Sequence, residues 1–371
     1  MHVASAEMAS RPVLAFTLLS LTMSACAGDA DDVDTGSVDT GSTSAATEPD
    51  PSTSSASGND STGPDETSGG SSTTLDATDS ATDDTQGESD TRGLECDALP
   101  RGPFTPELFT DAFSGSEDIG FDGKGSLAGK AGQDVILVDA QGQTSVLASG
   151  VGTAYGLRFL PTGELVIALP QAGTLVRVTP DGTVSNWVTG LSGPNGVYPD
   201  HDGNVWVTEF SGSRITRVDP NGDTTTIAQG GPELAAPNGI VWDPDRRLLY
   251  YTNYQAQRVR ALPMNEQGDF GDPILVAVLP ANGPDGLVLD ACGNLYVVAQ
   301  QSNEIWRIWL DEQGGPVGDP ELIASLPTNA ANAQFGSGPG FDPTSLYAAG
   351  VPGDVYRIEI GVPGAPIPTV P

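Results

Sequence analysis

Six residues recur at one phase of a repeated sequence pattern, and four of them carry oxygen donors suited to a metal ion. Stepping back eight residues from the second residue of six aligned turn pairs gives Glu117, Tyr155, Asn195, Asn238, Asp285 and Ser337. The set contains two carboxylates and two amides. Two carboxylates and two amide oxygens form a hard ligand set that suits Ca²⁺, whereas Zn²⁺ prefers His or thiolate ligands.

The same residue pairs have a plainer interpretation. Asn-Gly and Asp-Gly are common turn dipeptides, so Asn195, Asn238 and Asp285 could simply shape the backbone. Here, however, the pairs precede β-rich runs, and the turns that join two runs lie further along the chain. We therefore expect the four oxygen-bearing side chains to meet around one ion. Tyr155 and Ser337 are expected to line the same pocket, with Tyr155 either donating to a leaving group or packing at the rim.

The elements that must position these residues are short strands in a long repeat. The six aligned residues are separated by 38, 40, 43, 47 and 52 positions, and each repeat holds about four β-rich runs, such as 203–210, 214–218 and 224–228. This period predicts an all-β, six-bladed β-propeller, in which the innermost strands line a central channel. Residues 100–114 are expected to supply the strand that closes the ring. A β-sandwich is the alternative, but it does not explain a period of this length.

Composition divides the 371 residues into three parts. The chain has 15 Lys and Arg against 49 Asp and Glu, a net charge of -34, which argues against a nucleic-acid partner. Residues 27–95 hold 17 acids and one base, with few large apolar side chains. Such a segment cannot bury enough apolar surface to fold. We predict a signal peptide over 1–25, a disordered acidic Ser/Thr/Asp-rich linker over 26–95 and the propeller over 96–371.

The N-terminal segment predicts a lipid anchor. The apolar stretch 12–23 is too short to span a bilayer, and it ends in small residues before Cys26, which resembles a bacterial lipobox. We expect lipidation of Cys26 and a place in the bacterial cell envelope, at the outer membrane, with membrane contact through the lipid alone; an ordinary secretory signal is the alternative. Two further cysteines, Cys96 and Cys292, would form a disulfide or remain free thiols.

Four motifs resemble those of the regucalcin, gluconolactonase and luciferin-regenerating enzyme family, which is related to the paraoxonases. They lie at 116–119, 193–197, 237–245 and 284–287, and the resemblance covers roughly 115–360. It implies Ca²⁺ held by Glu117, Asn238 and Asp285, with Asn195 as a further ligand or substrate contact, and hydrolysis of lactones. The histidine pair associated with paraoxonases is missing, since the domain's only histidine, His201, lies in a predicted exposed turn. Residues 203–228 also resemble streptogramin lyases, but their catalytic histidines are absent.

These observations predict a monomeric, Ca²⁺-dependent hydrolase of lactones or esters at the mouth of the propeller channel. The metal would act as a Lewis acid, with Asp285 as base or nucleophile. Asp118 would either reach a second cation or make a turn hydrogen bond. The loops 210–212, 254–257 and 300–303 carry few charges, which favours a neutral small-molecule substrate. A non-catalytic surface ligand-binding propeller with a structural Ca²⁺, and an inert scaffold, are the alternative functions.

Overall fold

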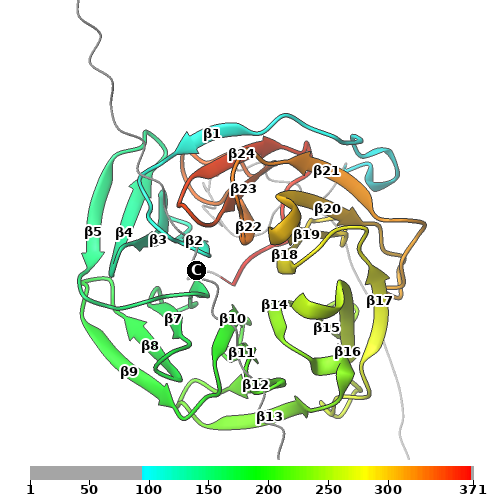
Figure 1. Cartoon of the computed structure of the whole chain (residues 1–371), viewed down its shortest axis with the longest axis horizontal. Helices are drawn as coiled ribbons and strands as arrows, with labels where there is room; N and C mark the ends of the chain where they lie inside the picture. The colour runs from blue at the N-terminus through cyan, green and yellow to red at the C-terminus, as the bar shows by residue number, and fades with distance from the viewer. Residues whose placement is uncertain (1–93, 369–371) are drawn as a thin grey trace, which may run out of the picture. The chain divides into compact units, whose positions relative to one another are not determined.

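A computed structural model describes residues 94–368, so the predicted signal peptide, Cys26 and nearly all of the predicted linker lie outside the described residues. Within this range, strands β1 to β24 form six four-stranded antiparallel sheets that surround a central channel like blades (Figure 1). The predicted six-bladed propeller is confirmed. None of the helices in the described part of the chain has the length and apolar character needed to cross a membrane.

The first five blades each use four consecutive strands, numbered from the channel outward. Blade one consists of β2 (Ile119–Phe121), β3 (Ser126–Ala131), β4 (Asp134–Asp139) and β5 (Thr144–Ala148). Blade two consists of β6 (Leu157–Phe159), β7 (Leu165–Leu169), β8 (Thr174–Val178) and β9 (Val184–Thr189). Blade three consists of β10 (Pro194–Pro199), β11 (Val205–Glu209), β12 (Arg214–Val218) and β13 (Thr224–Gln229). Blade four consists of β14 (Pro237–Asp243), β15 (Leu248–Asn253), β16 (Arg258–Pro263) and β17 (Ile274–Val278). Blade five consists of β18 (Pro284–Leu289), β19 (Leu295–Ala299), β20 (Glu304–Ile308) and β21 (Glu321–Ser325).

The sixth blade joins the two ends of the domain. It consists of β22 (Asn332–Phe335), β23 (Ser345–Ala349), β24 (Val355–Glu359) and the first strand of the domain, β1 (Glu107–Thr110). Because β1 pairs antiparallel with β24, the ring is closed by backbone hydrogen bonds between residues far apart in sequence. This strand lies within the segment 100–114 that was expected to close the ring. Four short 3-10 helices accompany the strands: η1 (Cys96–Ala98), η2 (Pro232–Leu234), η3 (Tyr254–Ala256) and η4 (Gln300–Ser302).

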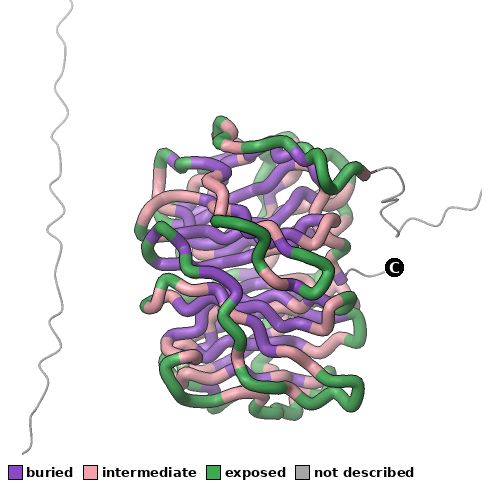
Figure 2. The backbone as a smooth tube through the Cα atoms, turned by 90° about the vertical axis from the view of Figure 1, so that its right-hand side faces the viewer, coloured by how far each residue is buried: buried purple, intermediate pink, exposed green. Residues whose placement is uncertain are grey.

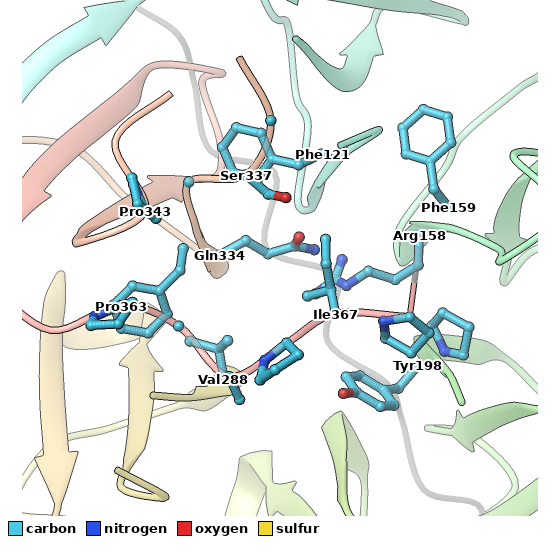
Figure 3. A pocket seen from close by; sticks show the side chains of 18 of the residues that line it. Phe121, Arg158, Phe159, Tyr198, Val288, Gln334, Ser337, Pro343, Pro363 and Ile367 are labelled. Carbon is cyan, nitrogen blue, oxygen red and sulfur yellow. The ribbon is translucent and has the colours of Figure 1, made fainter. Parts of the chain in front are cut away.

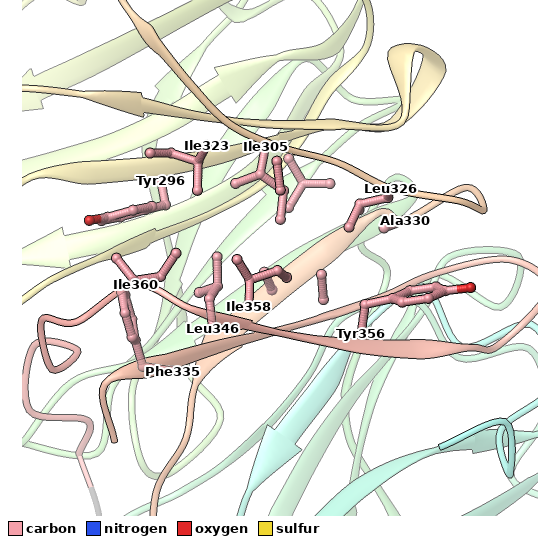
Figure 4. Packing of buried hydrophobic residues seen from close by; sticks show 14 of the residues in the cluster. Tyr296, Ile305, Ile323, Leu326, Ala330, Phe335, Leu346, Tyr356, Ile358 and Ile360 are labelled. Atoms are coloured by element: carbon pink, nitrogen blue, oxygen red, sulfur yellow. The ribbon is translucent and has the colours of Figure 1, made fainter. Parts of the chain in front are cut away.

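Burial follows the position of a strand in its blade. All five residues of the second strand of blade three, β11, are buried, whereas the outermost strand β13 is mostly exposed. The middle strands are covered on both faces by neighbouring blades, so they are rich in apolar residues (Figure 2). Between blades five and six, for example, Ile305 and Ile323 pack with Leu346 and Ile358 in one cluster (Figure 4). The cores between neighbouring blades hold the channel-lining strands in fixed positions.

Many of the domain's acidic residues cap turns. The Asp200 carboxylate accepts hydrogen bonds from the backbone N–H groups of Asp202 (3.0 Å) and Asn204 (2.9 Å) in the turn after β10. Asp290 repeats the arrangement after β18 with Cys292 and Asn294 (2.9 and 2.8 Å). Such turns explain why Asp is frequent without implying a ligand at each site.

A disulfide joins Cys96 in η1 to Cys292 in the turn between β18 and β19, with the two Cα atoms 5.5 Å apart. Of the two alternatives that the sequence left open, the structure contains the disulfide. It links the start of the domain to blade five, 196 positions further along the chain.

Candidate functional site

A pocket of about 460 Å³ lies at the end of the channel where the innermost strands begin. Its lining combines two carboxylates, several amides and three aromatic rings. The lining residues are Glu117, Tyr155, Pro170, Gln171, Gly193, Asn195, Phe210, Ser211, Asn238, Tyr254, Asp285 and Gln300. Five of the six residues singled out by the repeat phase therefore meet in one cavity, although they come from five different blades.

The strands place three of these side chains in the same way. Asn195, Asn238 and Asp285 are each the second residue of an innermost strand, preceded by Pro and followed by Gly. Glu117 and Tyr155 lie two residues before β2 and β6. Equivalent positions on neighbouring blades point to the same mouth of the channel, so the side chains converge.

The glycine that follows four of these five positions is required by contact between blades, whereas Glu117 is followed by Asp118. The Gly156 N–H donates to the carbonyl oxygen of Asn195 on the next blade (3.0 Å). A Cβ atom at Gly239 would lie 2.3 Å from the carbonyl oxygen of Asp285, which is closer than atoms can approach. The Asn-Gly and Asp-Gly pairs are therefore not turns in this fold. Glycine lets the backbones of adjacent blades touch, and that contact fixes the direction of the preceding side chain.

Ser337 does not join the other five residues, which corrects the prediction that it lines this pocket. The position in blade six that matches Asn195 is Ala331, whose carbonyl oxygen accepts a hydrogen bond from the Gly286 N–H (2.7 Å). The connection between β22 and β23 spans 336–344, whereas the corresponding connection in blade five spans only 290–294. Stepping back a constant eight residues therefore ended inside the longer loop, and Ser337 lines a separate cavity at the other end of the channel.

No cationic side chain within residues 94–368 forms an ion pair with either carboxylate of the pocket. Burial raises the pKa of Asp285 well above its usual value, and the negative charges of Glu117 and Asp118 raise it further. Burial also raises the pKa of Glu117 to about 7, although the positive charge of Lys130 opposes this change. No described residue donates a hydrogen bond to either side chain. A buried pair of like charges is costly, so the pocket is electrostatically prepared for a cation.

Asp118, by contrast, is fully engaged by neighbouring groups. Its carboxylate forms an ion pair with the Arg158 guanidinium and accepts hydrogen bonds from the backbone N–H groups of Ile119 (2.9 Å) and Leu157 (3.0 Å). Both carboxylate oxygens are used. Of its two predicted roles, the structure shows the hydrogen-bonding one, although the bonds from Leu157 and Arg158 come from the next blade instead of closing a turn.

Aromatic and amide side chains form the rim of the pocket. The rings of Phe210 and Tyr254 meet edge to face with centroids 5.9 Å apart. The Tyr254 hydroxyl donates to Gln300 Oε1 (2.6 Å) and accepts from Gln301 Nε2 (3.2 Å). These loops were predicted from the sequence to flank the site, whereas Gln171 was not predicted; it follows β7 at the phase where Ser211 follows β11.

His201 lies outside the pocket. It is exposed in the turn between β10 and β11, at the far end of the strand that begins near Asn195. Within residues 94–368, no cluster of three or more His, Cys, Asp or Glu side chains is arranged to hold a metal. A cation site in the pocket would therefore depend on the amides of Asn195 and Asn238 as well as on the two carboxylates.

Comparison with known proteins agrees with this geometry. Residues 223–336 match the model of the SMP-30/Gluconolactonase/LRE-like region, and this stretch contains Asn238 and Asp285. The chain thus contains a stretch that matches this family model within a six-bladed propeller, and the predicted resemblance to the regucalcin, gluconolactonase and luciferin-regenerating enzyme group is confirmed over these residues. A search of curated proteins found no match.

Solved structures share the fold. A gluconolactonase from Xanthomonas campestris has 19% identity and a TM-score of 0.58, over 71% of this chain and 99% of that one. A luciferin-regenerating enzyme has 18% identity and a TM-score of 0.58, over 72% and 99%. A calcium-binding regucalcin from Agrobacterium tumefaciens has 17% identity and a TM-score of 0.58, over 74% and 100%. At this identity the likeness concerns the fold.

Proposed function

We propose that the pocket holds a Ca²⁺ ion and hydrolyses a lactone or ester. The observation that carries the proposal is the meeting of Glu117 and Asp285, without a partner cation, beside the amides of Asn195 and Asn238. Two carboxylates balance one divalent cation, and carboxylate and amide oxygens are ligands that Ca²⁺ accepts. The family region over 223–336 and a calcium-binding relative of the same fold support this assignment.

Each chain residue has a defined task in this mechanism. Glu117, Asn195, Asn238 and Asp285 would hold the ion, which supplies Lewis-acid polarisation of the substrate carbonyl when it is bound. An Asp285 oxygen would take a proton from a water molecule while the oxygen of that water forms a bond to the carbonyl carbon of the lactone. The single bond between this carbon and the ring oxygen then breaks, and the ring oxygen takes up the proton, which gives a hydroxy acid. Attack by Asp285 itself on the carbonyl carbon is the alternative route.

The rim favours a neutral substrate with an apolar part. Phe210 and Tyr254 offer aromatic surface, while Gln171 and Gln300 offer amide donors and acceptors. The rim brings no cationic side chain into the pocket, and the two carboxylates disfavour a second anion. A neutral lactone therefore fits this lining better than a carboxylate or phosphate.

Turnover of γ- and δ-lactones, measured with Ca²⁺ and after chelation, tests the proposal. We expect hydrolysis with Ca²⁺, its loss on chelation, and a decrease of about 10²- to 10⁴-fold in kcat for Asp285→Asn, since general bases contribute this much. A matched control is Asp202→Asn, an exposed acid in the turn at the other end of β10. Unchanged turnover in Asp285→Asn would overturn the assigned role.

A non-catalytic binding propeller with a structural Ca²⁺ is the second candidate. One observation favours this structural role: the backbone carbonyl oxygens of Asn195 and Asp285, two of the proposed ligand residues, already take part in contacts between blades. In that case Ca²⁺ would raise the melting temperature while no lactone or ester is hydrolysed.

We also propose that the chain is a monomeric lipoprotein of the bacterial envelope, anchored at the outer membrane through Cys26. The support is the sequence alone, because Cys26 lies outside the described residues. Labelling with radioactive palmitate in a bacterial host tests this: the chain should incorporate label, and Cys26→Ala should abolish incorporation and release the protein from membranes. Gel filtration of the released form checks its oligomeric state.

A further inference from the structure

A second cavity lies at the opposite mouth of the channel, where the innermost strands end. Phe121, Phe159 and Phe335 are the last residues of β2, β6 and β22, and all three line it. The cavity measures about 220 Å³, and the C-terminal segment 363–368 contributes one of its walls (Figure 3). Backbone hydrogen bonds hold this segment in place, including Ala365 N–H to the carbonyl oxygen of Leu289 (2.9 Å).

The walls of this cavity are mainly apolar. Aromatic rings, aliphatic side chains and prolines surround a small number of polar groups, a composition typical of sites for small molecules. The polar side chains in the lining are Arg158, Tyr198, Gln334 and Ser337. Arg158 is the only charged residue among the lining residues.

Only part of the Arg158 guanidinium is used by the protein. Its Nη1 atom donates to Asp118 and to the carbonyl oxygens of Leu157 (2.7 Å) and Ile119 (3.1 Å). Its Nε and Nη2 atoms donate to no described residue. Figure 3 shows the guanidinium pointing into the cavity, between Gln334 and Ile367. A guanidinium edge with two free N–H donors matches the geometry of a carboxylate.

Two neighbouring groups supply further hydrogen bonds. The Tyr198 hydroxyl has no hydrogen-bond partner among the described residues, and Tyr198 lines the same cavity as Arg158. Gln334 donates through Nε2 to the carbonyl oxygen of Ile119 (2.7 Å), which fixes its orientation. The donors that are left over thus gather at one end of an apolar cavity.

We propose that this cavity binds a small apolar monocarboxylate. The ligand's carboxylate would accept hydrogen bonds from the free Nε–Nη2 edge of Arg158 and from the Tyr198 hydroxyl, while its hydrocarbon body packs against Phe121, Phe159 and Val288. Asp118 stays hydrogen-bonded through Nη1, so the ligand carboxylate and Asp118 would share one guanidinium. The proposal does not depend on Ca²⁺ or on hydrolysis at the other mouth.

Calorimetric titration of the full-length chain in EDTA, with benzoate and hexanoate as probes, tests this site. We expect one carboxylate bound per chain and at least tenfold weaker binding of the neutral analogues benzamide and hexanamide, since a charge-assisted bidentate contact is lost. Arg158→Lys keeps a positive charge beside Asp118 but lacks the second edge, and it should bind at least tenfold more weakly. Tyr198→Phe should weaken binding severalfold.

A blocking variant separates this cavity from the first one. Ser337→Phe should fill the cavity and abolish binding, whereas Ser145→Phe, at an exposed position of β5, should bind as the wild type does. Asp285→Asn should also leave binding unchanged. The proposal is overturned if neither carboxylate binds, if carboxylates and amides bind equally, if Ser337→Phe still binds, or if Asp285→Asn abolishes binding. Because EDTA is present throughout, none of these results depends on the proposed hydrolase activity.

Discussion

Replacing Glu117 by Gln should change stability in opposite directions with and without Ca²⁺. In the metal-free protein, burial and the nearby charge of Asp118 raise the pKa of Glu117 from 4.5 to about 7. Between these two values the folded state binds more protons than the unfolded state, so stability falls as pH rises. Below pH 4.5 the ionisation of Glu117 does not lower the stability of the folded state, and above pH 7 it lowers this stability by its full amount.

The size of the effect follows from the same interval. From 4.5 to about 7, at 1.36 kcal/mol per pH unit, ionised Glu117 lowers the free energy of unfolding by about 3 kcal/mol. The Gln side chain has nearly the same shape and no charge, so Glu117→Gln should raise the free energy of unfolding by most of this amount at pH 8 in EDTA. For a domain of this size the gain corresponds to a rise in Tm of about 6 °C. At pH 4 the variant and the wild type should be equally stable.

With Ca²⁺ the order reverses. A ligand at 1,000 times its Kd stabilises the folded state by about 4.1 kcal/mol, which exceeds the cost of about 3 kcal/mol, and a variant that lacks a ligating carboxylate gains much less. Urea unfolding at pH 4, 6 and 8, in EDTA and in Ca²⁺, measures both effects, with Glu312→Gln as an exposed control. The reasoning is refuted if Glu117→Gln is less stable than the wild type at pH 8 in EDTA, or if Ca²⁺ stabilises both proteins equally.

Three further changes test the packing around the channel by chemical denaturation. Gly239→Ala places a Cβ atom 2.3 Å from the Asp285 carbonyl oxygen, so it should lower the free energy of unfolding by ~1–3 kcal/mol and weaken Ca²⁺ binding. Unchanged stability would refute the contact between blades. Arg158→Met leaves Asp118 buried without its partner and should cost ~3–5 kcal/mol, most of which a second change, Asp118→Asn, should restore. Cys96→Ser removes a disulfide that spans 196 positions and should lower the free energy of unfolding by ~2–5 kcal/mol. Reducing conditions should lower the free energy of unfolding of the wild type by no more than this amount.

The sequence predicts the propeller well because the repeat is set by local signals. Turn dipeptides and β-rich runs mark each strand, and the period limits the number of blades. The same signals place Asn195, Asn238 and Asp285 at one channel mouth, because the second residue of each innermost strand has the same orientation. The prediction for Ser337 is wrong because the longer loop in blade six shifts the phase of the repeat. The length of a loop does not appear in a pattern of strand residues.

Contacts between blades are the part that the sequence could not predict. Asp118 and Arg158 are 40 positions apart, and nothing in either local motif shows that they form an ion pair. The wall that the segment 363–368 adds to the second cavity is equally invisible in the sequence, since that segment has no regular strand pattern. Both features depend on how neighbouring blades and the chain end meet at the channel.

The distribution of charge along the channel supports the interpretation of the first pocket as a cation site. Two buried acids of the domain are neutralised directly by a cation: Arg158 pairs with Asp118, and Arg214 pairs with Glu209. Among the residues that the structure describes, Glu117 and Asp285 have no such partner, and the charge of Glu117 raises the pKa of Asp285 further. If this mouth of the channel had only to be filled, an apolar pair or an Arg would serve at lower cost. The proposed cation, entering from solution, would account for an arrangement that keeps two carboxylates near each other and unpaired.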